Sequence, residues 1–407
     1  MICGLLGRKL SHSYSPQIHK SLGTYTYNLY EVEPEELESF LKSDDFSGLN
    51  VTIPYKKTVI PYCHRLSPCA EKLGAVNTII RDPEGNLIGH NTDYFGFASM
   101  VARSKLQLWG KKVLVLGSGG ASVTVNCVLK ELGAIPIIIS RSGENNYMNL
   151  DLHKDASVIV NATPVGMYPN TQVSPIDLSL FPNLEGVLDL IYNPARTKLL
   201  QDAESRGLVA QNGLWMLVAQ AKESAEWFTQ GQIPDSCIEK IYVQLRNEME
   251  NLILIGMPGS GKSSVGRELA RLTGKTFLDA DALIEEEAGK PIPEIFAENG
   301  EETFRKLETK VLSQVGMNSG LVIATGGGCV TKARNYPLLH QNGTIFWLRR
   351  DLDKLPTEGR PLSKAGHLEE MYRIRDPLYT AFADQSVDNN GTVQQTCNEI
   401  ITTGGTE

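Results

Sequence analysis

No apolar stretch in this sequence approaches the roughly 20 residues that a membrane-spanning helix requires. The longest runs, such as Ile135 to Ile139 and Leu252 to Ile255, are much shorter, so a membrane is not expected as a partner. The N-terminus lacks a basic flank followed by an apolar region, and no signal peptide is predicted. Because lysine and arginine form no dense block, nucleic acid is not expected as a partner either.

The seven cysteines are scattered, and none has the paired spacing of a zinc site or of a CxxC redox motif. We therefore expect reduced thiols and a cytoplasmic protein. The formal net charge of −8 is mild and leaves room for anionic metabolites, which need only a few well-placed cations. A chain of 407 residues with 41% hydrophobic and 21% charged residues has ordinary globular composition and predicts two or three domains. The oligomeric state is not defined by these features.

The pattern along the chain divides it into three segments. Residues 1–100 alternate short β-rich runs with polar helical stretches, and residues 101–212 read as parallel-sheet units in which Pro136 indicates an edge strand or a strand start. Residues 213–240 begin with a helix that we expect to pack back on the first segment. A new strand at Asn251 opens the third segment, residues 249–407. Alternating strands and helices predict an α/β fold with doubly wound sheets in both halves.

A glycine-rich turn follows an apolar strand in the second segment. Lys111 to Leu116 predicts the strand and Gly119 to Leu132 the helix. In such a turn the first glycine permits a tight bend, the next lets a pyrophosphate approach the backbone, and N–H groups of the helix start face the anion. Ser122 replaces the usual third glycine, so the fingerprint is imperfect. The residues expected to hold a dinucleotide are Gly117, Ser118, Gly119, Gly120 and Ala121.

The end of the next strand predicts which dinucleotide binds. A site for NAD places Asp or Glu here to accept a hydrogen bond from the ribose 2′-OH, but this sequence has Ser140 and Arg141. Because a guanidinium matches a 2′-phosphate with two hydrogen bonds, we expect NADP(H) rather than NAD.

Seven ordered motifs surround this turn, and together they are far more specific than any one of them. They are Leu10-Ser-His-Ser-Tyr-Ser-Pro16, Asn50-Val-Thr-Ile-Pro-Tyr-Lys56, Gly74-Ala-Val-Asn-Thr78, Asn91-Thr-Asp93, Asn161-Ala-Thr-Pro-Val-Gly-Met167, Asp189-Leu-Ile-Tyr-Asn-Pro194 and Gly213 through Gln220. In order and spacing they resemble shikimate dehydrogenase over essentially residues 1–240.

The resemblance implies an α/β substrate domain joined to a Rossmann-type domain and the NADPH-dependent reduction of 3-dehydroshikimate to shikimate. Reducing a ring ketone needs a hydride and then a proton for the developing alkoxide. Lys56 is the candidate proton donor and Asp93 its partner; whether Lys56 transfers the proton or mainly stabilises charge stays open. By the resemblance, Ser13 and Ser15 bind the substrate carboxylate, Thr52, Asn77 and Gln220 hold ring hydroxyls, Asp93 and Tyr192 also face the substrate, and Gly213 faces the cofactor.

A second nucleotide motif opens the last segment. Gly256 to Ser263 fits G-x-x-x-x-G-K-[ST], follows a predicted strand at Asn251 to Gly256, and precedes a predicted helix at Ser263 to Leu272. Backbone N–H groups of such a loop enclose phosphates, its lysine reaches the β- and γ-phosphates, and its serine can ligate Mg²⁺. The expected nucleotide site comprises Gly256, Gly259, Ser260, Gly261, Lys262, Ser263 and Ser264.

The residues after this loop indicate which P-loop family it belongs to. The run Phe277 to Asp281 places two carboxylates two positions apart, on one side if a strand continues through both. With it come Phe304-Arg-Lys-Leu-Glu308, Thr325-Gly-Gly-Gly328, Gly359-Arg-Pro-Leu362 and Arg375-Asp-Pro-Leu-Tyr379. This set resembles shikimate kinase over residues 251–400, and implies a P-loop α/β/α domain resembling nucleoside monophosphate kinases.

The second resemblance implies ATP, Mg²⁺ and the phosphorylation of shikimate to shikimate 3-phosphate. Ser263 and Asp279 belong to the expected Mg²⁺ shell, Asp281 orients or deprotonates the accepting hydroxyl, and Lys262 and Arg360 neutralise the transferring phosphoryl group. Arg305 and Arg375 bind the substrate carboxylate, and Gly326, Gly327 and Gly328 let backbone approach the ring. One departure concerns the segment Asp351 to Lys364, where Pro356 stands at the place of an arginine that often stacks on adenine in the family.

The two resemblances support each other, because the product of the first reaction is the substrate of the second. Two alternatives remain open on the sequence. One is an active dehydrogenase carrying a degenerate, regulatory kinase-like half. The other is a quinate/shikimate dehydrogenase fused to a kinase for another small molecule.

Overall fold

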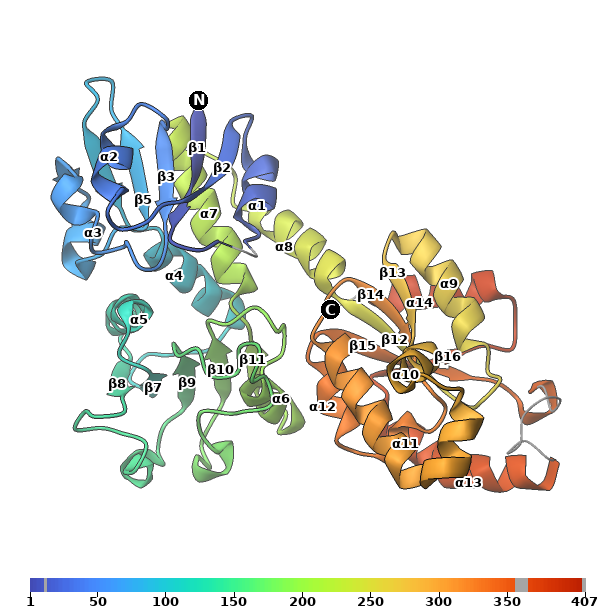
Figure 1. Cartoon of the computed structure of the whole chain (residues 1–407). Coiled ribbons are helices and arrows are strands. Elements are labelled where there is room, and N and C mark those ends of the chain that lie inside the picture. Colours follow the sequence, from blue (N-terminus) through green and yellow to red (C-terminus); the bar gives the residue numbers. More distant parts are fainter. Residues whose placement is uncertain (11–12, 356–364, 405–407) are drawn as a thin grey trace. The chain divides into compact units, whose positions relative to one another are not determined.

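The computed structural model describes residues 1–10, 13–355 and 365–404. Contacts between Cα atoms divide the chain into two compact units. Unit 1 contains residues 1–167, 173–192 and 199–244, and unit 2 contains residues 168–172, 193–198 and 245–407. Three sheets form their cores, two in unit 1 and one in unit 2 (Figure 1).

The first sheet is mixed and has the strand order β2-β1-β3-β5-β6-β4. Strand β1 pairs in parallel with β2 and β3, whereas β5 runs antiparallel to β3 and β6. Helix α7 is formed by residues far along the chain, yet it contacts α1 and β5 of this sheet layer, as predicted for residues 213–230. The elements are β1 (Ile2–Gly7), α1 (Ser15–Leu22), β2 (Thr26–Glu31), α2 (Leu37–Lys42), β3 (Gly48–Val51), η1 (Ile60–Tyr62), β4 (Arg65–Leu66), α3 (Pro68–Leu73), β5 (Thr78–Arg81), β6 (Leu87–His90), α4 (Asp93–Ser104) and α7 (Leu214–Thr229).

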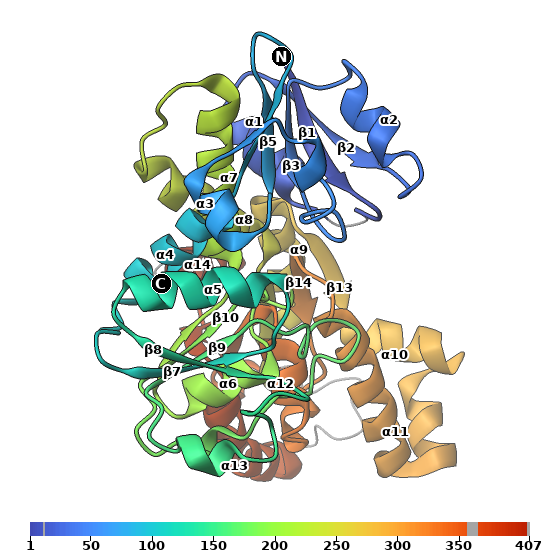
Figure 2. The same cartoon turned by 90° about the vertical axis from the view of Figure 1, so that its left-hand side faces the viewer.

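The second sheet is entirely parallel and has the strand order β11-β10-β9-β7-β8. Its central strands are apolar on both faces, as parallel strands covered by helices must be, and Figure 2 shows α5 and α6 on opposite faces. Pro136 lies in the edge strand β8, which confirms the expectation from its missing N–H. The elements are β7 (Lys112–Leu116), α5 (Gly120–Glu131), β8 (Ile135–Ile139), η2 (Leu150–His153), β9 (Val158–Asn161), η3 (Leu178–Leu180), β10 (Gly186–Asp189), α6 (Lys198–Ser205) and β11 (Val209–Gln211).

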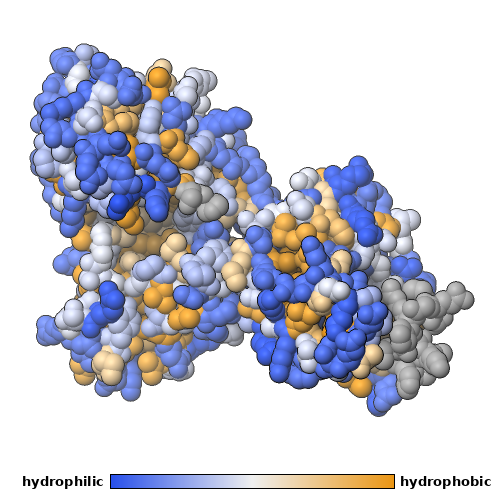
Figure 3. Space-filling view, in the orientation of Figure 1, coloured by the Kyte–Doolittle hydropathy of each residue, from blue (hydrophilic) through white to orange (hydrophobic). Residues whose placement is uncertain are grey.

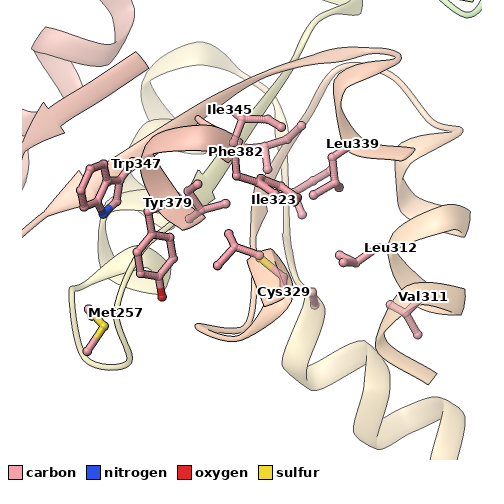
Figure 4. Close-up of a cluster of buried hydrophobic side chains, with 14 of the residues drawn as sticks. Met257, Val311, Leu312, Ile323, Cys329, Leu339, Ile345, Trp347, Tyr379 and Phe382 are labelled. Carbon is pink, nitrogen blue, oxygen red and sulfur yellow. The ribbon is translucent and has the colours of Figure 1, made fainter. Parts of the chain in front are cut away.

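The third sheet is also parallel, with the order β13-β14-β12-β15-β16. Figure 4 shows part of its core, where Met257 of the loop after β12 and Tyr379 of α13 lie among buried apolar side chains. The elements are α8 (Ser236–Met249), β12 (Asn251–Ile255), α9 (Lys262–Thr273), β13 (Thr276–Asp279), α10 (Ala280–Ala288), α11 (Ile292–Gly316), β14 (Leu321–Ala324), η4 (Cys329–Thr331), α12 (Asn335–His340), β15 (Gly343–Arg349), η5 (Leu352–Lys354), α13 (Ala365–Phe382), β16 (Gln385–Asp388) and α14 (Val393–Gly404).

The sequence left open whether a strand continues from Asp279 through Asp281. The strand carrying Asp279 does not continue through Asp281, because β13 ends at Asp279 and α10 begins at Ala280. The Asp279 carboxylate accepts a hydrogen bond from the Asp281 N–H at 3.1 Å and so caps the new helix. The two carboxylates are therefore brought together by a strand-to-helix junction and not by strand alternation.

The surface of each unit is mostly polar on the face drawn in Figure 3, with scattered apolar residues. Within the described part of the chain, no helix is both long enough and apolar enough to span a bilayer.

Candidate active sites

A cavity of about 310 Å³ in unit 1 gathers side chains from both of its sheets. Ten of the residues expected in the dehydrogenase site line it: Ser13, Ser15, Thr52, Lys56, Asn77, Asp93, Ala121, Tyr192, Gly213 and Gln220. The carboxyl ends of β1 and β3, the start of α4 and the middle of α7 contribute to this lining. Parallel strands end at a common edge, so polar residues scattered over the first 220 positions meet at one place.

Lys56 and Asp93 form the charged pair of this cavity. The Lys56 Nζ lies 2.6 Å from Asp93 Oδ2, and their side chains are 34% and 18% exposed. Asp93 opens α4, and its own N–H donates to Asn91 Oδ1 at 3.1 Å. The structure thus places a lysine side chain, held by a carboxylate, at the wall of a polar cavity.

Behind the cavity lies a buried hydrogen-bond network that the motifs did not reveal. Its centre is Ser224, whose Oγ accepts from Asn50 Nδ2 at 2.7 Å and lies 2.9 Å from Thr78 Oγ1 and 3.0 Å from Thr92 Oγ1. Asn77 Oδ1 accepts from the Thr92 N–H at 2.7 Å. Ser224, Thr78 and Thr92 are fully buried. Through Thr92, this network holds the Asn77 side chain in a fixed position at the cavity wall.

Gln220 belongs to the same network and shows how Ser224 could have been found. The Ser224 hydroxyl contacts the Gln220 carbonyl oxygen at 2.9 Å, one helical turn earlier in α7. Thr92 Oγ1 lies 3.3 Å from Gln220 Oε1. A buried polar residue four positions after a site residue lies on the same helix face, and that spacing was the available signal.

The glycine-rich turn of unit 1 fits the pyrophosphate of a dinucleotide. Gly117 has φ of +101°, which a residue with a side chain rarely adopts. Cβ atoms at Gly119 and Gly120 would meet no heavy atom within 4 Å, so the start of α5 is open. No side chain caps this helix, because its N-cap residue is Gly119, and the Ser122 hydroxyl donates to the Gly119 carbonyl. Free N–H groups at an open helix start suit an anion.

Arg141 follows β8 at the same edge of the second sheet. It is exposed and makes no hydrogen bond or ion pair within the described ranges. Neither Arg141, Ser140 nor the turn residues Gly117 to Gly120 line the cavity of about 310 Å³; only Ala121 of that turn does. Most of the predicted cofactor residues therefore lie outside the substrate cavity, whereas Ala121 and Gly213 line it.

The P-loop of unit 2 joins β12 to α9. Gly256 and Gly261 have φ of +147° and +93°, so both need the freedom of glycine to turn the loop. Lys262 is buried, and its Nζ donates to the carbonyls of Gly256 at 2.9 Å and Met257 at 3.0 Å. Gly259, Ser260 and Ser264 complete the expected loop at the start of α9. The arrangement presents a lysine and helix N–H groups to an anion.

Two residues with oxygen atoms that could bind a metal ion, Ser263 and Asp279, lie near the P-loop lysine. The Ser263 hydroxyl donates to Asp279 Oδ2 at 2.7 Å, and hydroxyl and carboxylate oxygens are ligands that Mg²⁺ accepts. Asp281, two residues on, is partly buried, and the loss of solvent raises its pKa, with Lys262 opposing the shift. The Asp281 carboxyl is thus a stronger base than an ordinary aspartate, as a proton acceptor requires.

The glycine run 326–328 packs against the predicted substrate residues. A Cβ at Gly326 would lie 2.6 Å from Asp281 Oδ1, and one at Gly328 would lie 2.2 Å from Arg305 Nη2. The Gly327 carbonyl accepts from Arg375 Nη1 at 3.1 Å and from Tyr379. The backbone of the glycine run can lie this close to Asp281 and Arg305 only because it carries no side chains; a Cβ atom at Gly326 or Gly328 would displace one of these two groups.

Arg305 is held in place by the carboxylate of Glu308, the last residue of the same motif. Its Nη1 pairs with Glu308 at 2.9 Å, and both side chains are buried. Burial raises the pKa of Glu308, while Arg305 opposes the shift. Of the expected kinase residues, Arg360 lies outside the described residues, as does Pro356. The others meet around the P-loop, Asp281 and the glycine run.

The first half thus has the parts of a dinucleotide-dependent oxidoreductase, and the second half has the parts of a P-loop phosphotransferase. Comparison with known proteins agrees with both assignments. Residues 5–79 match the family model for the shikimate dehydrogenase substrate binding domain, and residues 258–404 match the model for shikimate kinase. The chain belongs to the shikimate dehydrogenase family and carries a shikimate kinase domain at its C-terminus.

Individual relatives show how far the likeness extends. The chain is 34% identical over 267 residues to the NADP(+) shikimate dehydrogenase of Clostridium beijerinckii, covering 61% of this chain and 98% of that one. A solved chorismate mutase/shikimate 5-dehydrogenase fusion protein from Clostridium acetobutylicum is 39% identical with a TM-score of 0.57, covering 60% of this chain and 96% of that one. Shikimate 5-dehydrogenase of Thermus thermophilus, solved with NADP(H) and shikimate, is 30% identical with a TM-score of 0.55, covering 60% and 99%.

Proposed function

We propose that this chain catalyses two consecutive reactions in aromatic biosynthesis. The first half reduces 3-dehydroshikimate to shikimate with NADPH, and the second half transfers the γ-phosphoryl group of ATP to shikimate, giving shikimate 3-phosphate. The observation that carries the proposal is the cavity of unit 1, where ten expected site residues from distant motifs share one lining. We propose the cytoplasm as the place of both reactions.

In the dehydrogenase site, NADPH supplies the hydride when it is bound. Lys56 donates the proton that the developing alkoxide needs, and Asp93, 2.6 Å away, orients the Lys56 side chain. Ser13 and Ser15 donate hydrogen bonds to the substrate carboxylate, and Thr52, Asn77 and Gln220 hold the ring hydroxyls. Tyr192 closes another part of the cavity wall. Neutral donors suit a polyol, because every ring hydroxyl can both donate and accept.

Different residues of the proposed cofactor site bind different parts of the dinucleotide. The start of α5, with Gly117 to Ala121, receives the pyrophosphate, and Gly213 borders the substrate cavity. Arg141 pairs with the 2′-phosphate, and Ser140 adds a hydroxyl beside it. An exposed arginine with no partner among the described residues is suited to an anionic ligand.

In the kinase site, Mg²⁺ neutralises phosphate charge when it is bound, and Ser263 and Asp279 are its proposed ligands. Lys262 contacts the β- and γ-phosphates, with Arg360 as a second cation. Asp281 accepts the proton of the shikimate hydroxyl, for which its partly buried, more basic carboxyl is suited. Arg305, fixed by Glu308, and Arg375 bind the substrate carboxylate beside the glycine run 326–328.

One experiment tests both activities. The purified chain receives 3-dehydroshikimate, NADPH and Mg-ATP, and the products are identified by mass. We expect shikimate and shikimate 3-phosphate. Lys56→Ala should abolish the reduction and spare phosphorylation of added shikimate, whereas Lys262→Ala should do the reverse. Loss of both activities in either variant would contradict the two-site assignment.

This assay and a comparison of quinate with shikimate as substrates for oxidation separate the alternatives. Reduction without any phosphorylation would make the second half a regulatory nucleotide-binding module. Oxidation of quinate in preference to shikimate would change the substrate of the first half.

A further inference from the structure

An arginine outside the expected motifs lies beside the P-loop. Arg350 follows β15, the strand next to β12 in the third sheet. A Cβ at Gly261 would lie 3.6 Å from Arg350 Nη1, so the guanidinium stands next to the residue that precedes α9. Phosphates bind where the N–H groups of that helix start converge. Arg350 is thus within side-chain reach of the expected phosphate position.

Arg350 also lacks a partner of its own. It is partly buried, its Nε is buried without a hydrogen-bond partner, and it forms no ion pair with any residue in the described ranges. The neighbouring acids are engaged elsewhere, since Asp351 pairs with Lys354 at 3.1 Å and Asp388 accepts from Asn390 at 2.8 Å. Arginine remains charged in proteins, and leaving a buried donor unpaired costs stability. An anionic ligand would supply the missing partner.

The space next to Arg350 is large enough for a nucleoside. A cleft of about 1070 Å³ is lined by Arg350 together with Leu352, Tyr372, Asp388 and Asn390. Asn389 donates to the Ser260 carbonyl, which ties the loop after β16 to the P-loop. Two residues of the cleft lining, Asp388 and Asn390, are the chain neighbours of Asn389, so the cleft lies next to the residue that contacts the P-loop.

We propose that Arg350 binds the phosphate chain of ATP on the side nearest the adenosine. The inference rests on the proposed kinase function and extends it to a residue that no motif contains. A guanidinium presents paired donors to phosphate oxygens, and Arg350 approaches from β15. In the shikimate kinases that this half resembles, an arginine often stacks on adenine, and here Pro356 stands in its place. Arg350 would supply a different cation, at the phosphates.

The test uses Arg350→Ala and Arg350→Lys in the full chain. For Arg350→Ala we expect the KM for ATP and the Kd for Mg-ADP, measured by calorimetry, to rise about 10- to 100-fold, with the KM for shikimate unchanged. Arg350→Lys should recover part of the affinity, because it keeps the charge but loses the paired donors. Arg271→Ala is the matched control: it removes a cation from exposed α9, where Arg271 pairs with Glu268, and should leave both constants unchanged.

Binding of adenosine identifies the group that Arg350 contacts. We expect Arg350→Ala to leave adenosine binding unchanged, and an equal loss for adenosine and ADP would overturn the phosphate assignment. An unchanged Kd for ADP would overturn the whole inference. If the wild-type chain bound ADP through Arg350 but transferred no phosphoryl group, the proposed kinase function would fail while this binding role would stand.

Discussion

Removing the Ser224 hydroxyl should weaken both the folded state and substrate binding in the dehydrogenase half. In Ser224→Ala every neighbour keeps some other partner: Asn50 Nδ2 retains Thr78 at 3.1 Å, and Thr92 Oγ1 retains Asn77 at 3.1 Å. The loss in unfolding free energy should therefore correspond to the removal of one shared hydroxyl, and should be smaller than the sum of four separate hydrogen bonds. We expect a loss of about 1–2 kcal/mol in unfolding free energy.

The same loss should appear in the kinetics of reduction. Asn77 and Gln220 are held through this network, so the KM for 3-dehydroshikimate should rise about threefold to tenfold, which corresponds to about 1 kcal/mol of binding. The kcat should change less, because Lys56 and Asp93 are not in the network. Urea titration followed by dehydrogenase activity measures the stability, and steady-state kinetics measures the KM.

Two controls accompany this variant. Thr229→Ala removes a hydroxyl from the exposed end of the same helix, where it bonds only to the Ala225 carbonyl at 2.8 Å, and should change neither quantity. Kinase activity of the same chain should also stay constant. An unchanged KM together with an unchanged urea midpoint in Ser224→Ala would refute the argument that the network positions the substrate residues.

Three further predictions concern charge. Arg141→Asp should lower the preference for NADP over NAD about 10- to 100-fold in kcat/KM, because it replaces the cation by an acceptor for the ribose hydroxyl; an unchanged ratio would exclude Arg141 from the cofactor site. Burial raises the pKa of Glu223 to about 7 from 4.5, so the folded dehydrogenase half binds this proton more tightly than the unfolded chain, and its urea midpoint should fall as the pH rises from about 5 through 7. Glu223→Gln should flatten that slope, and an identical slope would show that other groups cause it. Asp281→Asn should lower kinase kcat about 100-fold or more without affecting reduction, and an unchanged kinase kcat would exclude Asp281 as the proton acceptor.

The strands and the motifs could be predicted from the sequence because both are local. The run Lys112–Leu116 is apolar on both faces, and Pro136 lacks the N–H that an inner strand would need, so the sheet position followed from single residues. The expected substrate residues of the dehydrogenase meet in one cavity because most of their motifs lie at strand ends and helix starts.

The parts that escaped prediction depend on contacts between distant residues. Ser224 is unremarkable in the sequence, since its importance comes from Asn50, Thr78 and Thr92, which only the folded sheet brings to it. The sequence left the junction at Asp279 open, because the hydrogen bond from the Asp281 N–H to the Asp279 carboxylate, which ends the strand, competes with a β conformation that the apolar pattern favours. Arg350 was missed since its place beside the P-loop depends on the pairing of β12 with β15.

The position of α7 has a consequence for how the chain can be assembled and divided. This helix is synthesised after the entire second sheet, yet it covers the first sheet and carries Gln220 and Ser224. About 200 residues are therefore synthesised before α7 can cover the first sheet. Contacts between residues so far apart in the sequence slow folding. A fragment cut between the two sheets would leave the earlier one without its cover, whereas a fragment ending after residue 249 would keep every segment that contributes to the cavity.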